Sequence, residues 1–301
     1  MKRDLTSIFD LNKDEIYKIF DITRELKDKQ KKGIEHKLLK DKTLAMIFEK
    51  PSLRTRVTFE TGMTQLGGHA IYLAPADIQL GKRESVADVA KNLSRWVDII
   101  MARVFSHKNI KELAKNANVP VINGLCDLEH PCQILCDLFT VIEKKGDLSK
   151  IVLAYVGDGN NVCNSFVAAS ALLGFKMTVA TPDGYEPDKD YLKKARNVKW
   201  TNNPKEAVKD ADVIYTDVWA SMGQESEAEQ RKKIFRPFQL NNELLKNTQK
   251  KDYLIMHCLP AHRGEEITDE VIDGPHSIVF DQAENRIHIQ KGIMVFLCLR
   301  S

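Results

Sequence analysis

The chain has 301 residues, with 45 lysines and arginines, 42 aspartates and glutamates, and a formal net charge of +3. This length suits two domains of ordinary size or one large α/β unit, and the near balance of charge gives no general sign of nucleic-acid binding. No apolar run reaches the roughly 18 residues that span a bilayer, and the N-terminus has no secretory pattern. We therefore expect a cytoplasmic protein that binds neither nucleic acid nor a membrane. Its six cysteines lack C-x-x-C spacing, so we expect reduced thiols.

The first half of the chain begins with a helix and continues as alternating strands and helices. Asn12, with Glu15 three residues later, is typical of a capping box and predicts an amphipathic helix that ends before Gly33. Short apolar runs then alternate with helical patterns, which predicts a parallel sheet covered on both faces. The strands predicted in this half are 44–48, 70–73, 99–102 and 119–122.

A long helix is predicted from His130-Pro131 to Lys145-Gly146, with Pro131 in its first turn. The strands predicted beyond it are 151–156, 177–180, 213–216 and 253–257, and residues 284–299 are predicted to form an apolar C-terminal helix. The predicted fold class is α/β, with two parallel-sheet αβα domains linked by interdomain helices. The expected domains are residues 1–138 and 139–283, with residues 284–301 packing back on the first.

The segment Ser52-Leu53-Arg54-Thr55-Arg56 directly follows the predicted strand 44–48. Ser52 is suited to cap a helix, whose N-terminus offers free backbone N–H groups and the positive end of a dipole. Two guanidiniums and two hydroxyls at that position favour a phosphate-binding cradle. The local sequence also fits a capped helix whose arginines only face water.

Gly157-Asp158-Gly159-Asn160-Asn161 follows the predicted strand 151–156 and precedes a helix. The position suits a dinucleotide fingerprint, but Val162 occupies the place of the third glycine, which disfavours binding of nicotinamide or flavin. Asn160 or Asn161 is expected to face the carboxyl edge of the sheet, where an asparagine suits a small ligand with carboxylate and amino groups.

Three further segments follow predicted strands. His130 and Gln133 lie one turn apart at a helix start and can face one polar ligand or only cap the helix. Asp217, which precedes Ser221-Met222-Gly223, is suited to hold an ammonium group. Cys258 in His257-Cys258-Leu259-Pro260 is a nucleophile, a hydrogen-bonding partner or inert. Because parallel sheets bind ligands at the carboxyl ends of their strands, this shared location is stronger evidence than any single motif.

Zinc binding by His130, Cys132 and Cys136 is disfavoured, because positions two apart on a helix do not share a face. Gly81-Lys82-Arg83-Glu84-Ser85 lacks the upstream glycine of a Walker loop and is interpreted as a charged surface loop.

Taken together, the motifs resemble the aspartate/ornithine carbamoyltransferase family, and within it the ornithine-specific members, over essentially the whole chain. The segments that carry the resemblance occur in order and are 52–56, 130–133, 217–223, 257–260 and 280–286. The resemblance implies transfer of a carbamoyl group from carbamoyl phosphate to the δ-amine of L-ornithine, giving L-citrulline and phosphate. It implies no metal and no organic cofactor, a carbamoyl phosphate-binding first domain, an L-ornithine-binding second domain and a homotrimer with shared active sites.

The resemblance also assigns roles to individual residues of this sequence. The catalytic residues it implies are Arg54, Arg103, His130 and Cys258. The carbamoyl phosphate-binding residues are Ser52, Leu53, Arg54, Thr55, Gln79, Arg103, His130, Gln133, Cys258, Leu259 and Arg286, with Gln79 entering the neighbouring subunit's site. The ornithine-binding residues are Asn161, Asp217, Ser221 and Met222. Leu53 and Cys132 depart from the family pattern, which has threonine at both positions.

In the implied mechanism an uncharged δ-amine attacks the carbonyl carbon while Arg54 and Arg103 stabilise the leaving phosphate and His130 donates to the carbonyl oxygen. Cys258 is interpreted as an orienting partner of the amine beside Asp217. The alternatives are a different amine acceptor such as putrescine or acetylornithine, a nucleotide-binding oxidoreductase, and a catalytically silent subunit. The direction of the reaction in arginine metabolism, expected to be biosynthetic, depends on substrate supply.

Overall fold

The computed structural model describes residues 2–220 and 225–299. The chain divides into two compact units, Met1–Phe139 with Glu284–Ser301, here unit 1, and Thr140–Ala283, here unit 2. Two long helices run through the unit boundaries, α6 (Pro131–Lys145) and α13 (Val279–Cys298). The C-terminal part of α13 therefore belongs to unit 1, as the apolar pattern of residues 284–299 predicts.

Unit 1 is built on a four-stranded parallel sheet with the order β2-β1-β3-β4. In the register Leu44 pairs with Ala70 on one side and with Ile99 on the other. The buried apolar runs that predict these strands are what allows both faces to be covered by helices. The strands are β1 (Thr43–Phe48), β2 (His69–Leu73), β3 (Ile99–Arg103) and β4 (Val121–Leu125).

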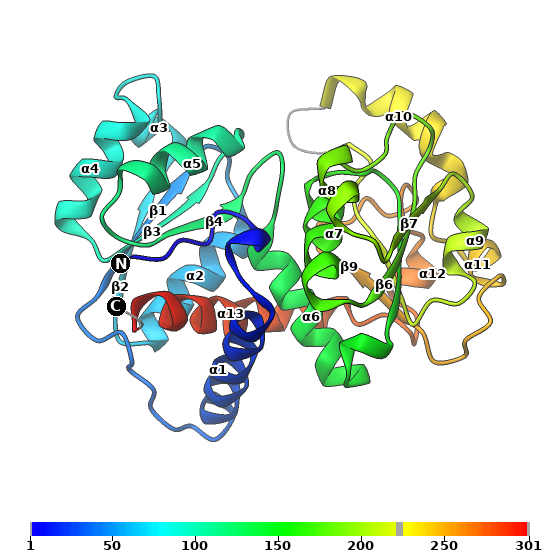
Figure 1. The fold of residues 1–301 in the computed structure, drawn as a ribbon, viewed down its shortest axis with the longest axis horizontal. Coiled ribbons are helices and arrows are strands. Elements are labelled where there is room, and N and C mark those ends of the chain that lie inside the picture. Colours follow the sequence, from blue (N-terminus) through cyan, green and yellow to red (C-terminus); the bar gives the residue numbers. More distant parts are fainter. Residues whose placement is uncertain (1, 221–224, 300–301) are drawn as a thin grey trace. The chain divides into compact units, whose positions relative to one another are not determined.

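The helices of unit 1 cover both faces of this sheet. Figure 1 shows α4 and α5 on one face and α2 and α13 on the other. On the first face Ala45, Ile47 and Ile100 of the sheet form a core with Val89 of α4 and Leu113 of α5. The helical segments are η1 (Ile8–Asp10), α1 (Lys13–Lys31), α2 (Leu53–Gln65), α3 (Pro75–Ile78), α4 (Val86–Trp96) and α5 (His107–Asn116).

Unit 2 contains a five-stranded parallel sheet with the order β7-β6-β5-β8-β9. Its central strand β5 is buried almost along its whole length, which fits a strand with neighbours on both sides and helices on both faces. The strands are β5 (Val152–Val156), β6 (Lys176–Ala180), β7 (Val198–Thr201), β8 (Val213–Thr216) and β9 (Leu254–His257).

The helices of unit 2 are mostly short. Val208, Leu244 and Val271, from three different helices, pack against Ala154 and Ile214 of the sheet. The helical segments are η2 (Leu148–Lys150), α7 (Asn161–Leu173), α8 (Lys189–Lys194), α9 (Pro204–Val208), η3 (Glu225–Glu227), α10 (Ala228–Phe235), η4 (Arg236–Phe238), α11 (Asn242–Leu245) and α12 (Asp269–Ile272).

The predicted parallel α/β fold is confirmed, but one predicted strand has different bounds and one strand was not predicted. The strand predicted at 119–122 is β4, which starts at Val121 and continues through Asn123 and Gly124, two residues whose types favour a turn. Glycine at position 124 has a packing reason within the strand, because a Cβ there would lie 2.5 Å from Met101 Sδ. Strand β7 is missing from the prediction because it is a half-exposed edge strand without a buried apolar run.

Within the described ranges, the structure contains no helix long and apolar enough to cross a membrane.

Candidate functional site

In each unit some of the predicted site residues lie where the strand order of the sheet reverses. In unit 1 the chain turns outward in opposite directions from β1 and β3, and in unit 2 from β5 and β8. At such a switch point the connections leave on opposite faces, so a crevice opens at the carboxyl ends of the two strands. Ser52 follows β1, Arg103 ends β3, and Asp217 follows β8.

The N-terminus of α2 has the capped geometry that the sequence predicts. Ser52 is the N-cap, and its hydroxyl accepts a hydrogen bond from Thr55 N at 3.4 Å. Leu53 is the first helical residue and its side chain is 74% exposed, so this departure from threonine removes no buried contact in the described structure. The N–H groups of the first turn have no intrahelical acceptor and carry the positive end of the helix dipole.

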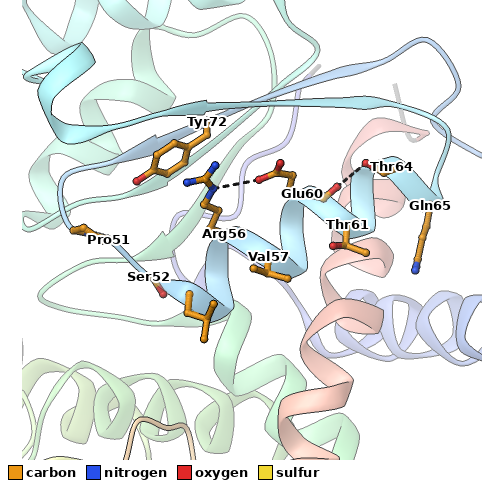
Figure 2. Close-up of a pocket in the computed structure, with 10 residues that line it drawn as sticks. Pro51, Ser52, Arg56, Val57, Glu60, Thr61, Thr64, Gln65 and Tyr72 are labelled. Carbon is orange, nitrogen blue, oxygen red and sulfur yellow. Dashed lines mark hydrogen bonds and ion pairs between the residues drawn. The ribbon is translucent and has the colours of Figure 1, made fainter.

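The second arginine of the motif, Arg56, lies on the outer face of α2. The Arg56 guanidinium lies 3.8 Å from the centre of the Tyr72 ring and pairs with Glu60 at 3.3 Å (Figure 2). It lines a groove of about 700 Å³ on the outer face of α2, together with Leu53 and Val57. Arg56 therefore stabilises the outer face of α2 and leaves Arg54 as the motif's arginine at the site.

His130 lies among three guanidiniums. Burial and then the charges of Arg286, Arg103 and Arg54 lower the pKa of His130 well below its usual value. The Arg103 guanidinium also donates to the Thr55 hydroxyl at 3.4 Å, which connects the end of β3 to the first turn of α2. His130 is therefore a neutral imidazole at pH 7, and the cluster around it attracts an anion.

Arg286 enters this cluster from α13. Its Nη1 donates to the Gln133 side-chain oxygen, and Gln133 in turn donates to Asp137 at 2.8 Å. The remaining nitrogens, Nε and Nη2, are buried and have no hydrogen-bond partner among the described residues. A buried guanidinium with unsatisfied donors is costly unless an anion binds it, so this arrangement favours a phosphate-like ligand.

Two other residues of unit 1 have clear surroundings. Gln79 is exposed in a left-handed conformation (φ 42°) after α3, and its side chain makes no hydrogen bond within residues 2–220 and 225–299. Cys132 is fully buried and donates to the Asn123 carbonyl at 3.4 Å, and burial raises its pKa to about 12. The Cys132 thiol is therefore a protonated structural group.

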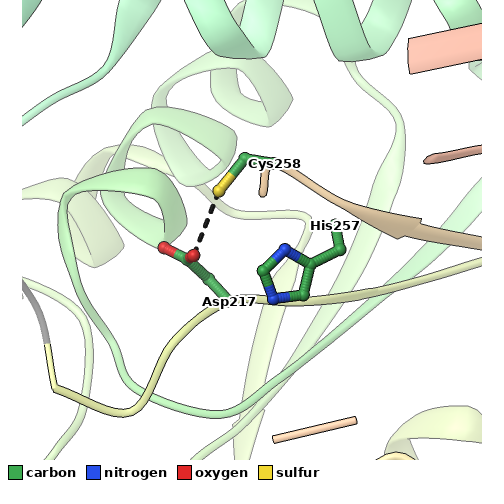
Figure 3. Close-up of side chains that lie close together, drawn as sticks. All are labelled: Asp217, His257 and Cys258. Atoms are coloured by element: carbon green, nitrogen blue, oxygen red, sulfur yellow. Dashed lines mark hydrogen bonds between the residues drawn. The ribbon is translucent and has the colours of Figure 1, made fainter. Parts of the chain in front are cut away.

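In unit 2, Asp217 connects the ends of three strands. Its carboxylate accepts from the Cys258 thiol at 3.0 Å (Figure 3) and from the Asn160 amide at 2.8 Å. The Asn160 side-chain oxygen accepts from the Tyr155 hydroxyl at 3.0 Å and caps α7. Burial, with a further contribution from Asp217, raises the pKa of Tyr155, so its hydroxyl remains a donor.

The other predicted acceptor residues are distributed around this cluster. Asn161 is the first residue of α7 and partly exposed, whereas its neighbour Asn160 is the one that bonds to Asp217. Leu259 has a left-handed backbone (φ 57°) beside Cys258. Ser221 and Met222 lie outside the described residues. The sequence left both asparagines as candidates for the sheet edge, but the family resemblance assigned the ligand contact to Asn161, and the hydrogen bond between Asn160 and Asp217 was not foreseen.

The glycine-rich turn after β5 has a structural explanation. A Cβ at Gly159 would lie 2.4 Å from the backbone of Glu186 and Pro187, so glycine is required for close packing of that loop. Burial raises the pKa of Asp158 to about 7 although Arg231 pairs with it at 3.2 Å. These contacts explain the motif without a dinucleotide.

Asp217, His257 and Cys258 lie close enough together to be tested as a metal site. Both ring nitrogens of His257 are already engaged, Nδ1 by Leu259 N at 2.8 Å and Nε2 by Glu266 at 3.0 Å. His257 could ligate an ion only by losing one of these bonds, so the residues do not fit a metal centre.

The fold and these two clusters define an α/β protein of two parallel-sheet units, with a cluster of guanidiniums around His130 in one unit and a carboxylate–thiol cluster in the other. Residues 3–143 match the family model of the aspartate/ornithine carbamoyltransferase carbamoyl-P binding domain, and residues 149–297 match the model of the Asp/Orn binding domain. The chain belongs to the aspartate/ornithine carbamoyltransferase family.

Individual relatives match this chain over nearly its whole length. The chain is 56% identical to the ornithine carbamoyltransferase of Pyrococcus horikoshii, covering 98% of this chain and 95% of the relative. The solved structure of the ornithine carbamoyltransferase from Pyrococcus furiosus is 55% identical, with a TM-score of 0.97, and the match covers 100% and 98% of the two chains. The anabolic ornithine carbamoyltransferase structure from Campylobacter jejuni is 37% identical, with a TM-score of 0.93 and coverage of 99% and 100%.

Proposed function

We propose that this protein transfers the carbamoyl group of carbamoyl phosphate to the δ-amine of L-ornithine, giving L-citrulline and phosphate. The observation that carries the donor half is the group of three guanidiniums around the neutral His130, with two buried Arg286 nitrogens that find no hydrogen-bond partner among the residues the structure describes. The relative from Pyrococcus furiosus is named as an anabolic ornithine carbamoyltransferase, which favours a role in arginine biosynthesis.

In the proposed donor site, Ser52, Leu53, Arg54 and Thr55 bind the phosphate with the first turn of α2. Arg103 and Arg286 add charge-assisted hydrogen bonds, which are the strong kind for phosphate oxygens. As the C–O bond to phosphate breaks, its electron pair moves onto the phosphate, and these groups stabilise the growing charge. Gln133, which accepts from Arg286, fixes the direction of that guanidinium.

His130 acts as a neutral donor to the carbonyl oxygen. A neutral imidazole has one N–H, and the lowered pKa keeps His130 in that form at pH 7. Charge develops on the carbonyl oxygen when the amine adds to the carbon, so a fixed N–H at this atom lowers the barrier. The histidine does not need to gain or lose a proton during the step.

The acceptor half is assigned to Asp217, Asn161, Ser221 and Met222, with Cys258 and Leu259 next to the reacting carbon. The buried Asp217 carboxylate suits the amino end of ornithine, and the Cys258 thiol beside it orients the uncharged δ-amine. The nitrogen forms its bond to the carbonyl carbon and loses one proton to solvent. No covalent enzyme intermediate is needed, because positioning two substrates in line supplies much of the acceleration.

The experiment is a citrulline-formation assay with carbamoyl phosphate and L-ornithine, with putrescine and acetylornithine as competing acceptors. The proposal expects ornithine to have the highest kcat/KM, and a preference for another amine would replace the acceptor assignment. Arg54→Ala is expected to raise the carbamoyl phosphate KM by about 10- to 100-fold, the loss of a charged hydrogen bond. Arg24→Ala, an exposed arginine paired with Asp21, is the control, and equal effects would contradict the cradle.

We also propose a homotrimer with shared active sites, in which a second copy of the chain covers the groove on α2. Leu53 and Val57 are 74% and 49% exposed there, directly beside the proposed phosphate site. Exposed apolar residues grouped at a groove are typical of a protein interface. The exposed Gln79, which has no side-chain hydrogen bond within the described ranges, is the residue expected to reach a neighbour's site.

A further inference from the structure

Beneath Cys258 lies a pair of polar side chains that the proposed chemistry does not use. His257 Nε2 and Glu266 Oε1 are 3.0 Å apart, and both side chains are fully buried. Figure 3 shows the His257 ring next to the Asp217–Cys258 contact. Burying two ionisable groups is costly, so their retention next to a reacting group calls for a specific reason.

The hydrogen bonds determine which nitrogen of His257 carries a proton. The backbone N–H of Leu259 approaches Nδ1 at 2.8 Å, and since an N–H can only donate, Nδ1 must be the acceptor. A doubly protonated ring has no acceptor, so the imidazole is neutral with its proton on Nε2. That proton points at Glu266 Oε1, which means that Glu266 stabilises this tautomer.

This tautomer stabilises an uncommon backbone conformation. Leu259 has φ 57°, in the left-handed region, which is unfavourable for a residue other than glycine. The bond from Leu259 N to His257 closes a ring across Cys258, in the manner of a side chain that accepts from the N–H two residues later. Cys258 is thereby held at both neighbouring residues while its thiol contacts Asp217.

Two more bonds fix the same turn from outside. Glu266 Oε1 also accepts from His262 N at 2.6 Å, and Gln282 accepts from His257 N at 3.1 Å. Glu266 therefore holds both the start of the turn, through the His257 ring, and its end, through the backbone of His262. The position of the Cys258 thiol is therefore fixed by hydrogen bonds on both sides of it, at His257 and at Leu259.

We propose that Glu266 and His257 are positioning residues for acceptor binding, which act by holding the Cys258-Leu259 backbone. Glu266 stabilises the Nε2–H tautomer of His257, and the Nδ1 lone pair then accepts the hydrogen bond from Leu259 N. This inference rests on the proposed function for its kinetic readout, but the placement of the Cys258 thiol can be measured without substrates.

The test compares two substitutions that each keep one half of the imidazole. His257→Asn keeps an acceptor near Nδ1, because an asparagine oxygen can accept from the N–H two residues later. His257→Gln keeps a donor near Nε2 and loses the Leu259 acceptor. We expect His257→Asn to stay within about threefold of the wild-type ornithine KM, and His257→Gln to raise it about tenfold, as for loss of one neutral hydrogen bond.

Glu266 offers a second pair of variants that does not depend on how well residue 257 tolerates substitution. Glu266→Gln keeps an oxygen acceptor for the ring proton and is expected to resemble the wild type, whereas Glu266→Ala is expected to resemble His257→Gln. Ser170→Ala is the matched control, since Ser170 is buried and donates to the Phe175 carbonyl at the far end of α7. It is expected to lower Tm without changing the ornithine KM.

The second readout is the rate at which iodoacetamide labels Cys258, followed by peptide mass spectrometry in the absence of substrates. A loosened turn changes this rate in His257→Gln and Glu266→Ala but not in His257→Asn and Glu266→Gln. The positioning role would be overturned if His257→Gln behaved like His257→Asn, and Glu266→Ala like Glu266→Gln, in both the ornithine KM and the labelling rate. Variants that changed only Tm would overturn it as well. If the wild type forms no citrulline, the proposed function fails, and the labelling rates still test the inference.

Discussion

At the scale of single residues, the candidate site combines buried groups whose charge state is set by their surroundings. His130 stays neutral because burial and three guanidiniums lower its pKa, and Tyr155 stays protonated because burial and Asp217 raise its pKa. Both groups are therefore hydrogen-bond donors at pH 7 with no proton transfer of their own. This suits a reaction in which the enzyme positions substrates and stabilises developing charge.

Cys258→Ser is expected to retain substantial activity. A serine hydroxyl can donate to Asp217 as the thiol does at 3.0 Å, so kcat/KM for ornithine should fall by no more than about tenfold, one neutral hydrogen bond. Cys258→Ala removes the donor and is expected to be worse. Isolation of a carbamoyl-thioester on Cys258 after acid quench would contradict the orienting role.

His288 is expected to make the protein sensitive to acid. Burial, together with the charges of Lys291 and nearby lysines, lowers the pKa of His288 to about 3, while an unfolded histidine titrates near pH 6.5. Between these values the unfolded state binds more protons, so the free energy of unfolding falls as pH falls, by at most about 1.4 kcal/mol per pH unit. The stabilisation is complete above pH 6.5 and is lost toward pH 3.

The measurement is Tm from pH 7 to pH 4 for the wild type and His288→Leu. The variant should lose Tm less steeply with falling pH, because its side chain takes up no proton. His69→Asn, at an exposed histidine, is the control. If Tm fell with pH equally steeply in the wild type and in His288→Leu, the titration of His288 would not contribute to the acid sensitivity.

At the scale of elements, α2 places different functions on two faces. Its capped N-terminus, with Ser52, Arg54 and Thr55, lies at the carboxyl edge of the sheet, while Arg56 and Val57 lie on the outer groove. Because successive helical residues are separated by about 100°, neighbours such as Thr55 and Arg56 point in different directions. One helix therefore serves the proposed phosphate site and the proposed subunit interface.

The contact between α13 and α1 gives a prediction on stability. A Cβ at Gly292 would lie 2.2 Å from Thr23 Oγ1 and 3.1 Å from the Ile19 carbonyl. Gly292→Ala is therefore expected to lower the free energy of unfolding by about 1–3 kcal/mol, as overpacking does, although alanine favours a helix by about 1 kcal/mol. Thermal unfolding measures this loss.

A double-mutant cycle identifies the cause. Thr23→Ala removes the atom nearest to the new methyl group, so the pair Thr23→Ala with Gly292→Ala should be more stable than the sum of the single losses predicts. Additive losses would mean that the Ile19 backbone, and not the threonine, opposes the methyl group.

At the scale of the whole molecule, each unit has its own switch point, and one half of the proposed chemistry is assigned to the carboxyl edge of each sheet. The donor half uses residues after β1, at the end of β3 and after β4, with Arg286 from the end of the chain. The acceptor half uses residues after β5, β8 and β9. Two substrates of different charge are thus assigned to two sheets with the same architecture.

Shared active sites predict complementation between inactive subunits. Assayed at a carbamoyl phosphate concentration below the wild-type KM, Arg54→Ala and Gln79→Ala are each expected to have low activity as pure trimers. In mixed trimers, a Gln79→Ala subunit supplies Arg54 and its Arg54→Ala neighbour supplies Gln79, so random mixing restores about a quarter of the sites. Denaturing, mixing and refolding the two variants, with each variant refolded alone as control, measures this recovery. A mixture no more active than its parts would contradict sharing through Gln79.

Most of the fold could be predicted because strand and cap signals are local. Asn12 with Glu15, and Ser52 with Thr55, form the caps at the predicted places, and eight of the described strands overlap the short apolar runs predicted as strands. The parts of the fold that were not predicted depend on contacts with residues distant in the sequence. β7 is a half-exposed edge strand that pairs with β6, and Gly124 is part of β4, where the close approach of Met101 explains the glycine.

The sequence by itself determined the parallel α/β architecture, the helix caps and the family, because these depend on short apolar runs and on motifs in a fixed order. Only the tertiary structure decided which side chains act together. It separated Arg56 from Arg54, brought Arg286 to Gln133, joined Asn160 to Asp217 and placed Glu266 against His257. These pairings are set by burial and by directional hydrogen bonds between distant elements, which no local pattern encodes.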